Sequence, residues 1–160
     1  RVEAFQSRDL GPLGFADGDG KIVYYHSPVR KHTTATEFDV RKLESLPRVD
    51  MVLSYVGADG TMIEAAAKAG AKGIVSAGTG AGRPTPAEDA AFDKCFKETG
   101  MLMCLCSRVA AGRVVRSPGL QRRGFVAGDN LQPWKARLLL ALALTKTTNP
   151  DEIQRMIDTY

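Results

Sequence analysis

The sequence holds 160 residues with a net charge of +4, and this length suits one domain with a small appendage or two small lobes. Its 44% hydrophobic and 25% charged residues are ordinary for a globular protein with a core of its own. The mild positive charge predicts no nucleic-acid partner, because the aromatic residues do not interleave with basic ones as base stacking requires. No apolar run approaches the roughly 20 residues of a membrane span, so no membrane partner is expected.

The first stretch, residues 1–26, is predicted to form a β-hairpin. Its turn is Asp17-Gly18-Asp19-Gly20, because glycine tolerates the positive φ of tight hairpin turns, and a β-branched and aromatic strand follows at residues 22–25. Two strands alone are marginal in water, so the hairpin should pack on something that the first part of the chain does not supply. The chain also begins at Arg1 rather than at methionine, which predicts a removed leader or a longer parent protein.

Residues 27–47 are predicted to be an ordered linker, since proline stands near both ends and hydrophobic periodicity is weak. From residue 49 onward the pattern alternates between strands and helices. Three strands are predicted at 49–56, 73–77 and 101–106, with helices at 61–69 and 86–99 between them. This order predicts an α/β fold with a parallel sheet and right-handed crossovers.

The remaining chain is expected to continue in the same way. Residues 108–123 are predicted to be a basic loop, and residues 124–128 a short strand. A helix that starts near residue 131 carries the leucines at 138–144, and a last helix begins with the cap-and-proline pair Asn149-Pro150.

The loop Gly78-Thr79-Gly80-Ala81-Gly82-Arg83 follows a strand and precedes a helix, where phosphate-binding loops lie. Arg83 stands where the dinucleotide fingerprint needs glycine, and the strand at 101–106 brings no acidic residue. The Gly-Lys-Ser/Thr of the phosphate loop is also missing. A tight structural turn, a nucleotide cradle and a loop that presents its backbone to another active site therefore stay open, and nucleotide binding is disfavoured.

Other reactive residues show no catalytic arrangement. His26 and His32 have no serine or cysteine at a nucleophile spacing, and no pair of acids is marked out. Cys95, Cys104 and Cys106 are predicted to be buried thiols, because three is an odd number and their spacing fits no metal site. A basic cluster is expected to form a solvated face or an interface, with anion binding as a lesser alternative: Arg108, Arg113, Arg116, Arg122 and Arg123.

Seven segments resemble the type II bacterial L-asparaginases. They are GPLG at 11–14, PVRKHT at 28–33, FDV at 38–40, GIVSAGTG at 73–80, SRV at 107–109, NLQPWKAR at 130–137 and ALTKT at 143–147. The segments occur in the family's order, with compatible spacing, from about residue 5 to Tyr160. Together they are specific, although no single one decides the matter.

The resemblance implies a hydrolase of asparagine catabolism that converts L-asparagine to L-aspartate and ammonia without a metal or organic cofactor. It implies a homotetramer, a dimer of dimers, in which each active site lies between the N-terminal domain of one subunit and the C-terminal domain of a neighbour. The catalytic threonines belong to the N-terminal domain, so the resemblance implies no catalytic residue in this chain, which alone should be inactive. It implies a periplasmic or secreted protein, with the cytoplasm as the alternative.

On this resemblance, residues 1–26 are a hairpin remnant of the N-terminal domain and residues 27–47 are the linker. Residues 48–160 are then the C-terminal domain, a three-layer, Rossmann-like unit around a small parallel sheet. The implied partners are the N-terminal domain of the same protein, further copies of the chain and a small-molecule amide substrate.

The same resemblance directs attention to the glycine loop. Family members supply an asparagine and a serine to the neighbour's site where this sequence has Ala81 and Ala87, and a glutamate from the later loop has no match among residues 114–118. The substrate-proximal residues in trans are therefore predicted to come from the loop itself: Gly80, Ala81, Gly82, Arg83 and Thr85. The alternative function is a free-standing ligand- or nucleotide-binding α/β module that uses loop 78–82.

Overall fold

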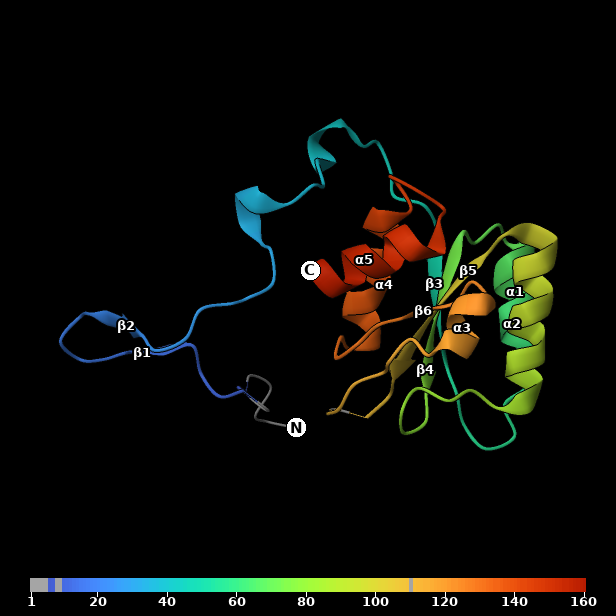
Figure 1. Ribbon diagram of the computed structural model, residues 1–160, viewed down its shortest axis with the longest axis horizontal. Coiled ribbons are helices and arrows are strands. Elements are labelled where there is room, and N and C mark those ends of the chain that lie inside the picture. The colour runs from blue at the N-terminus through green and yellow to red at the C-terminus, as the bar shows by residue number, and fades with distance from the viewer. Residues whose placement is uncertain (1–5, 8–9, 110) are drawn as a thin grey trace. The chain divides into compact units, whose positions relative to one another are not determined.

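The computed structural model describes residues 6–7, 10–109 and 111–160. The chain divides into two compact units, residues 1–36 and residues 37–160. In the first unit the predicted hairpin is confirmed, since β1 (Gly14–Ala16) pairs antiparallel with β2 (Ile22–Tyr24) (Figure 1). The side chains of Phe15, Ile22 and Tyr24 are exposed. The proposed limits at residues 26 and 47 stay predictions.

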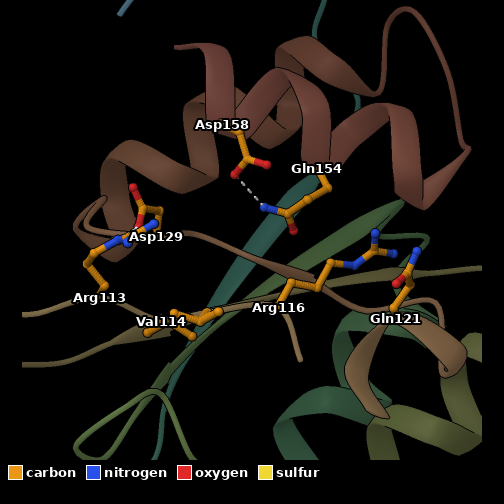
Figure 2. A pocket seen from close by; sticks show the side chains of 8 residues that line it. Arg113, Val114, Arg116, Gln121, Asp129, Gln154 and Asp158 are labelled. Atoms are coloured by element: carbon orange, nitrogen blue, oxygen red, sulfur yellow. Dashed lines mark hydrogen bonds and ion pairs between the residues drawn. The ribbon is translucent and has the colours of Figure 1, made fainter. Parts of the chain in front are cut away.

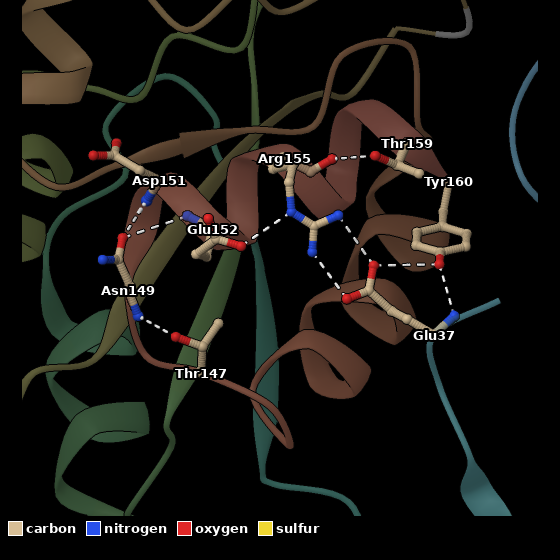
Figure 3. A network of polar contacts seen from close by, with 8 residues as sticks. All are labelled: Glu37, Thr147, Asn149, Asp151, Glu152, Arg155, Thr159 and Tyr160. Atoms are coloured by element: carbon tan, nitrogen blue, oxygen red, sulfur yellow. Dashed lines mark hydrogen bonds and ion pairs between the residues drawn. The ribbon is translucent and has the colours of Figure 1, made fainter.

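The predicted linker contains two single turns of 3-10 helix, η1 (Thr33–Ala35) and η2 (Val40–Lys42). Its residue Glu37 is held against the last helix, α5 (Pro150–Thr159), by a polar network (Figure 3). Arg155 donates through Nη1 and Nη2 to the carboxylate of Glu37 at 3.1 and 2.9 Å, and Glu37 N donates to the hydroxyl of Tyr160 at 2.8 Å. The ring of Phe38 packs on that of Tyr160 with centroids 5.1 Å apart. These contacts explain why the second unit begins at Glu37.

Four parallel strands form the sheet of the second unit, in the order β3 (Val49–Leu53), β4 (Gly73–Gly78), β5 (Leu102–Ser107) and β6 (Val126–Ala127). Helices α1 (Thr61–Lys68) and α2 (Pro86–Thr99) cover one face, and α4 (Pro133–Ala143) and α5 cover the other (Figure 1). This is the predicted α/β fold with three layers, and the alternation of strands and helices is confirmed.

Each face of the sheet has its own apolar core, because successive strand residues point to opposite faces. Met103 and Leu105 pack in the cluster that holds Phe92 of α2, whereas Cys104 and Cys106 pack in the cluster of α4 and α5. With both faces covered, β5 is apolar at nearly every position. The prediction of buried thiols is confirmed for all three cysteines. The hydrogen bond with the Cys106 thiol, together with burial, raises the pKa of Cys104 well above its usual value.

The prediction of a continuous loop at 108–123 is wrong in part, because α3 (Pro118–Arg122) lies within it. The hydroxyl of Ser117 accepts a hydrogen bond from Leu120 N and caps the helix, and Pro118 occupies its first turn. Gly119 weakens the helical pattern of this short segment in the sequence. The described part of the chain contains no helix with the length and apolar character needed to cross a membrane.

Candidate functional site

The carboxyl ends of the four strands meet at one edge of the sheet, which is where open α/β sheets bind ligands. The glycine loop, defined here as residues 79–83, follows the central strand β4 at this edge. It is flanked by the residues that follow β5, beginning with Arg108. The predicted site therefore lies where the fold class favours a functional surface.

The glycine loop is a closed turn. Thr79 N donates to Arg83 O at 3.0 Å and Arg83 N donates to Thr79 O at 2.9 Å, which joins the two ends of the loop. Gly80 and Gly82 adopt φ values of +49° and +80°, in the left-handed region that favours glycine. A Cβ on Gly82 would also stand 3.0 Å from the methyl carbons of Val114. The shape of the loop therefore depends on its glycines.

The end of β5 holds the glycine loop from one side. The hydroxyl of Ser107 donates to Gly80 O at 2.5 Å, and Arg108 N donates to Gly78 O at 2.9 Å. The same hydroxyl accepts a hydrogen bond from Val109 N at 3.1 Å. Because these bonds end on the backbone carbonyls of Gly80 in the loop and of Gly78 just before it, they fix the path of the loop independently of the side chain at position 81.

A buried carboxylate fixes the chain just after the glycine loop. Glu88 is 2% exposed, and its Oε2 accepts hydrogen bonds from the Ser54 hydroxyl at 2.6 Å and from Thr85 N at 2.8 Å. The hydroxyl of Thr85 accepts from Glu88 N and donates to Ala58 O at 2.8 Å. Thr85 and Glu88 form a capping box at the start of α2. The bond from Ser54 links this capping box to the end of β3. Arg108 adds a bond from Nη1 to Ser54 O at 2.9 Å.

A pocket of about 580 Å³ opens beside the glycine loop. Four of the five predicted site residues line it, namely Ala81, Gly82, Arg83 and Thr85, whereas Gly80 does not. The rest of the wall comes from the start of α2, from β5 and from the chain that follows β5: Pro84, Pro86, Asp89, Leu105, Arg113, Val115, Ser117, Leu120 and Arg123.

Arginine sets the charge of this pocket. Arg123 donates to Asp89 at 2.8 Å and to Asp93 at 3.0 Å, and its guanidinium lies 4.2 Å from the centroid of the Phe125 ring. Partial burial opposes the charge of Arg123, but the hydrogen bonds to both carboxylates outweigh it and raise its pKa. Arg113 pairs with Asp129, which raises the pKa of that guanidinium as well.

Arg83 differs from these two arginines. Its side chain is exposed and makes no hydrogen bond or ion pair within the described residues. Arg113 and Arg123 are neutralised by Asp129, Asp89 and Asp93, so Arg83 is the guanidinium of this lining that is open to an acidic group of a ligand.

The hydroxyl groups of the pocket are engaged in capping. Thr85 accepts from Glu88 N, and Ser117 accepts from Leu120 N. Within the described part of the chain, neither hydroxyl is hydrogen-bonded to a histidine or lysine that could activate it. What this side of the pocket offers a substrate is charge, shape and backbone groups.

Residues 48–157 match the model of the glutaminase/asparaginase C-terminal domain. The chain belongs to this family. It is 41% identical over 163 residues to L-asparaginase 2 of Escherichia coli, covering 99% of this chain and 46% of that protein. It is 38% identical over 161 residues to a probable periplasmic L-asparaginase of Haemophilus influenzae, again covering 99% of this chain and 46% of that protein.

The fold is similar to the crystal structure of a probable cytoplasmic L-asparaginase from Campylobacter jejuni, with a TM-score of 0.93 and 40% identity over 100% of this chain and 52% of that one. The chain spans about half the length of these asparaginases. The recognised family and the C-terminal placement of the chain are thereby confirmed.

Asparaginase-family membership bears on the nucleotide alternative, and so does the geometry. Thr79 N and Arg83 N are bonded within the glycine loop, and Glu88 N and Thr85 N are bonded within the capping box. A phosphate cradle needs such backbone groups free to meet the ligand. These four backbone N–H groups of the asparaginase-family chain are therefore not available to a phosphate.

The predicted histidines lie outside the pocket, whereas Arg113 and Arg123 of the basic cluster line it. His26 and His32 are exposed and belong to the unit of residues 1–36, whereas the pocket lies in the second unit. The basic cluster is not a simple solvated face, because four of its five members are bonded to protein groups: Arg108, Arg113, Arg116 and Arg123.

The sequence patterns did not identify Glu88 as the buried carboxylate that joins the start of α2 to the end of β3. They also did not predict that Arg113 and Arg123 line the pocket. The run Thr85-Pro86-Ala87-Glu88 carries the spacing of a capping box, and this signal could have identified Glu88. No local signal could have paired Arg123 with Asp89 and Asp93, because 30 or more residues separate the partners.

Proposed function

We propose that this chain is the C-terminal part of an L-asparaginase that hydrolyses L-asparagine to L-aspartate and ammonia. The observation that carries the proposal is the match along the whole chain to about half of each asparaginase, with the same fold. The proposal requires no metal ion and no organic cofactor. Its substrate class is a small amide with an α-carboxylate.

In this proposal the chain completes an active site whose nucleophile lies in the N-terminal domain. The hydroxyls of Thr85 and Ser117 support this division, because neither is bonded to a histidine or lysine base among the described residues, and nucleophilic catalysis needs a hydroxyl beside a base. The chain alone is therefore expected to be inactive. Joined to an N-terminal domain, it borders the site of the neighbouring subunit.

The glycine loop forms the substrate-proximal lip of that site. Its backbone at Gly80, Ala81 and Gly82 contributes shape, since the side chains there are absent or small. Arg83 contributes charge, because its exposed guanidinium suits a carboxylate. The hydroxyl of Thr85 is used in both directions, towards Glu88 N and towards Ala58 O, so this residue holds the loop in place.

The proposed partners are the N-terminal domain and further copies of the chain in a homotetramer. Large apolar side chains exposed at and just after the edge strand β3 support an assembly surface: Met51, Leu53, Tyr55 and Val56. Light scattering of the protein joined to its N-terminal domain should give the mass of four copies. A monomeric mass for the active protein would contradict this part of the proposal.

The proposed location is the periplasm or the exterior of the cell, with the cytoplasm as the alternative. The relatives include proteins named for each compartment, from H. influenzae and C. jejuni respectively. Fractionation of the source cells, with asparaginase activity as the readout, distinguishes the two.

The decisive experiment measures ammonia released from L-asparagine by the chain alone and by the chain combined with a separately produced N-terminal domain. We expect release only from the combination, and robust turnover by the chain alone would refute the division of labour. In the combined protein, Arg83→Ala should raise KM by about tenfold, the effect of losing one charge-assisted hydrogen bond. Lys97→Ala, at an exposed lysine of α2 outside the pocket, is the matched control and should leave KM unchanged.

A further inference from the structure

A second cavity, of about 360 Å³, lies between the segment 113–116 and helix α5 (Figure 2). It shares Arg113 and Val115 with the glycine-loop pocket but is otherwise built from different residues. Its walls are mostly polar: Arg113, Val114, Val115, Arg116, Gln121, Asp129, Gln154 and Asp158.

Arg116 is the unusual residue of this cavity. Its side chain is only 10% exposed, Nε donates to Phe125 O at 2.6 Å, and Nη1 donates to Asp151 at 2.6 Å. Its Nη2 is buried and has no hydrogen-bond partner among the described residues. A buried N–H group of a charged guanidinium is costly when unpaired. This atom therefore calls for an acceptor that enters the cavity.

Asp158 supplies the opposite charge. Its Oδ1 accepts a hydrogen bond from Gln154 Nε2 at 2.9 Å, and within the described chain it forms no ion pair. Figure 2 shows this carboxylate and Gln154 above the cavity, with Arg116 and Gln121 together to one side. The cavity thus presents an unsatisfied cationic donor at one place and, at another, a carboxylate that forms no ion pair within the described chain and acts on Arg113 only from a distance.

The charge count restricts the ligand further. The lining holds two arginines and two aspartates, and Arg113 is already paired with Asp129. A multiply charged anion such as phosphate would meet the carboxylates of Asp129 and Asp158 as well as Arg116, and like charges repel. A small molecule with one carboxylate and one ammonium group suits both ends.

We propose that this cavity is a binding site for a small zwitterion of the α-amino acid class. The carboxylate of the ligand accepts from Arg116 Nη2, and its ammonium donates to Asp158. Both groups are charged, so each bond is of the stronger, charge-assisted kind. The proposal concerns the chain's own residues and does not depend on the proposed asparaginase activity.

The test titrates the chain with glycine, the smallest α-amino acid, and follows its backbone amide signals by NMR. Acetate, ethylamine and inorganic phosphate are titrated in parallel, because they carry the carboxylate alone, the ammonium alone and a larger negative charge. We expect saturable shifts at Gln154 and Asp158 with glycine, and at least about tenfold weaker binding of the other three.

Two variants and a control assign the site. Asp158→Asn keeps an oxygen for Gln154 but loses the charge, and it should weaken glycine binding about tenfold or more. Glu98→Gln removes the same charge from an exposed position on α2 and should leave binding unchanged. Arg116→Lys should also weaken binding, but it alters the contacts with Phe125 and Asp151, so circular dichroism must first confirm its fold.

Three outcomes would overturn the proposal. The absence of saturable shifts with glycine would mean that water alone satisfies Arg116. Acetate or phosphate binding as tightly as glycine would indicate a plain anion site. Unchanged glycine binding in Asp158→Asn would show that this carboxylate has no part in it. None of these results bears on ammonia release from L-asparagine, so the two proposals fail separately.

Discussion

Replacing Glu88 with alanine should destabilise the second unit strongly, because this carboxylate is the buried junction between β3 and the start of α2. Its Oε2 accepts from the Ser54 hydroxyl and from Thr85 N, at 2.6 and 2.8 Å. The side chain is almost fully buried, and Ser54 is only 1% exposed. The alanine variant leaves both donors without their acceptor.

The magnitude follows from these two donors. An unsatisfied buried hydroxyl costs about 1–3 kcal/mol, and loss of a capping interaction costs about 1 kcal/mol. Removing the carboxylate also removes the cost of burying it, which offsets part of the loss. The two losses sum to about 2–4 kcal/mol, and the offset leaves an expected fall in the free energy of unfolding of about 1–3 kcal/mol.

The measurement is urea unfolding followed by circular dichroism, with Glu98→Ala as the control at an exposed position of the same helix. The control should change the free energy by less than about 0.5 kcal/mol. Ser54→Ala and the double variant complete a cycle. Because the two side chains share one hydrogen bond, the double variant should lose about 1 kcal/mol less than the sum of the single variants.

A change below about 0.5 kcal/mol for Glu88→Ala would refute this reasoning, because a surface residue behaves in that way. Strict additivity in the cycle would refute the narrower claim that Ser54 and Glu88 stabilise each other directly. A fall in the denaturant slope would instead point to a change in the unfolded or native ensemble.

Three further predictions test other parts of the second unit. Gly82→Ala should lower the free energy of unfolding by about 1–3 kcal/mol, because of the positive φ and the close methyl groups of Val114. Gly57→Ala is the control and should cost less, since Gly57 has a similar φ but open space around it. Equal losses in the two variants would show that the contact with Val114 has no effect. Cys104 should resist iodoacetamide at pH 8 in the native state and react after unfolding, since the hydrogen bond with the Cys106 thiol, together with burial, raises its pKa. Rapid labelling of Cys104 in the native protein would contradict this. The hydrogen bond from Thr61 N lowers the pKa of Asp59, so its stabilisation is present above the unfolded value of about 3.9 and disappears as the pH falls through the folded value. The stability gap between wild type and Asp59→Ala should therefore shrink from pH 7 to pH 2.5, and a constant gap would count against the charge.

Most of the fold could be predicted because its signals are local. Alternating apolar runs and helix-start residues such as Pro86 placed the strands and long helices to within a few residues. Helix α3 was missed because a helix of five residues with Gly119 inside it has too little periodicity to be recognised. The glycine loop was recognised from its composition and its position between a strand and a helix.

The sequence by itself determined the order of elements, the parallel sheet, the buried thiols and the family, since each rests on residues close together in the chain or on matched segments. Only the tertiary structure decided which polar side chains meet. Glu88 joins Ser54 across 34 positions, Arg116 reaches Asp151 across 35, and Arg108 reaches Ser54 across 54. Such partners are selected by the packing of strands and helices around both cores, and no local pattern encodes that choice. The same packing buries Arg116 beside helix α5 and leaves Arg83 exposed at the glycine loop, although both residues are arginine.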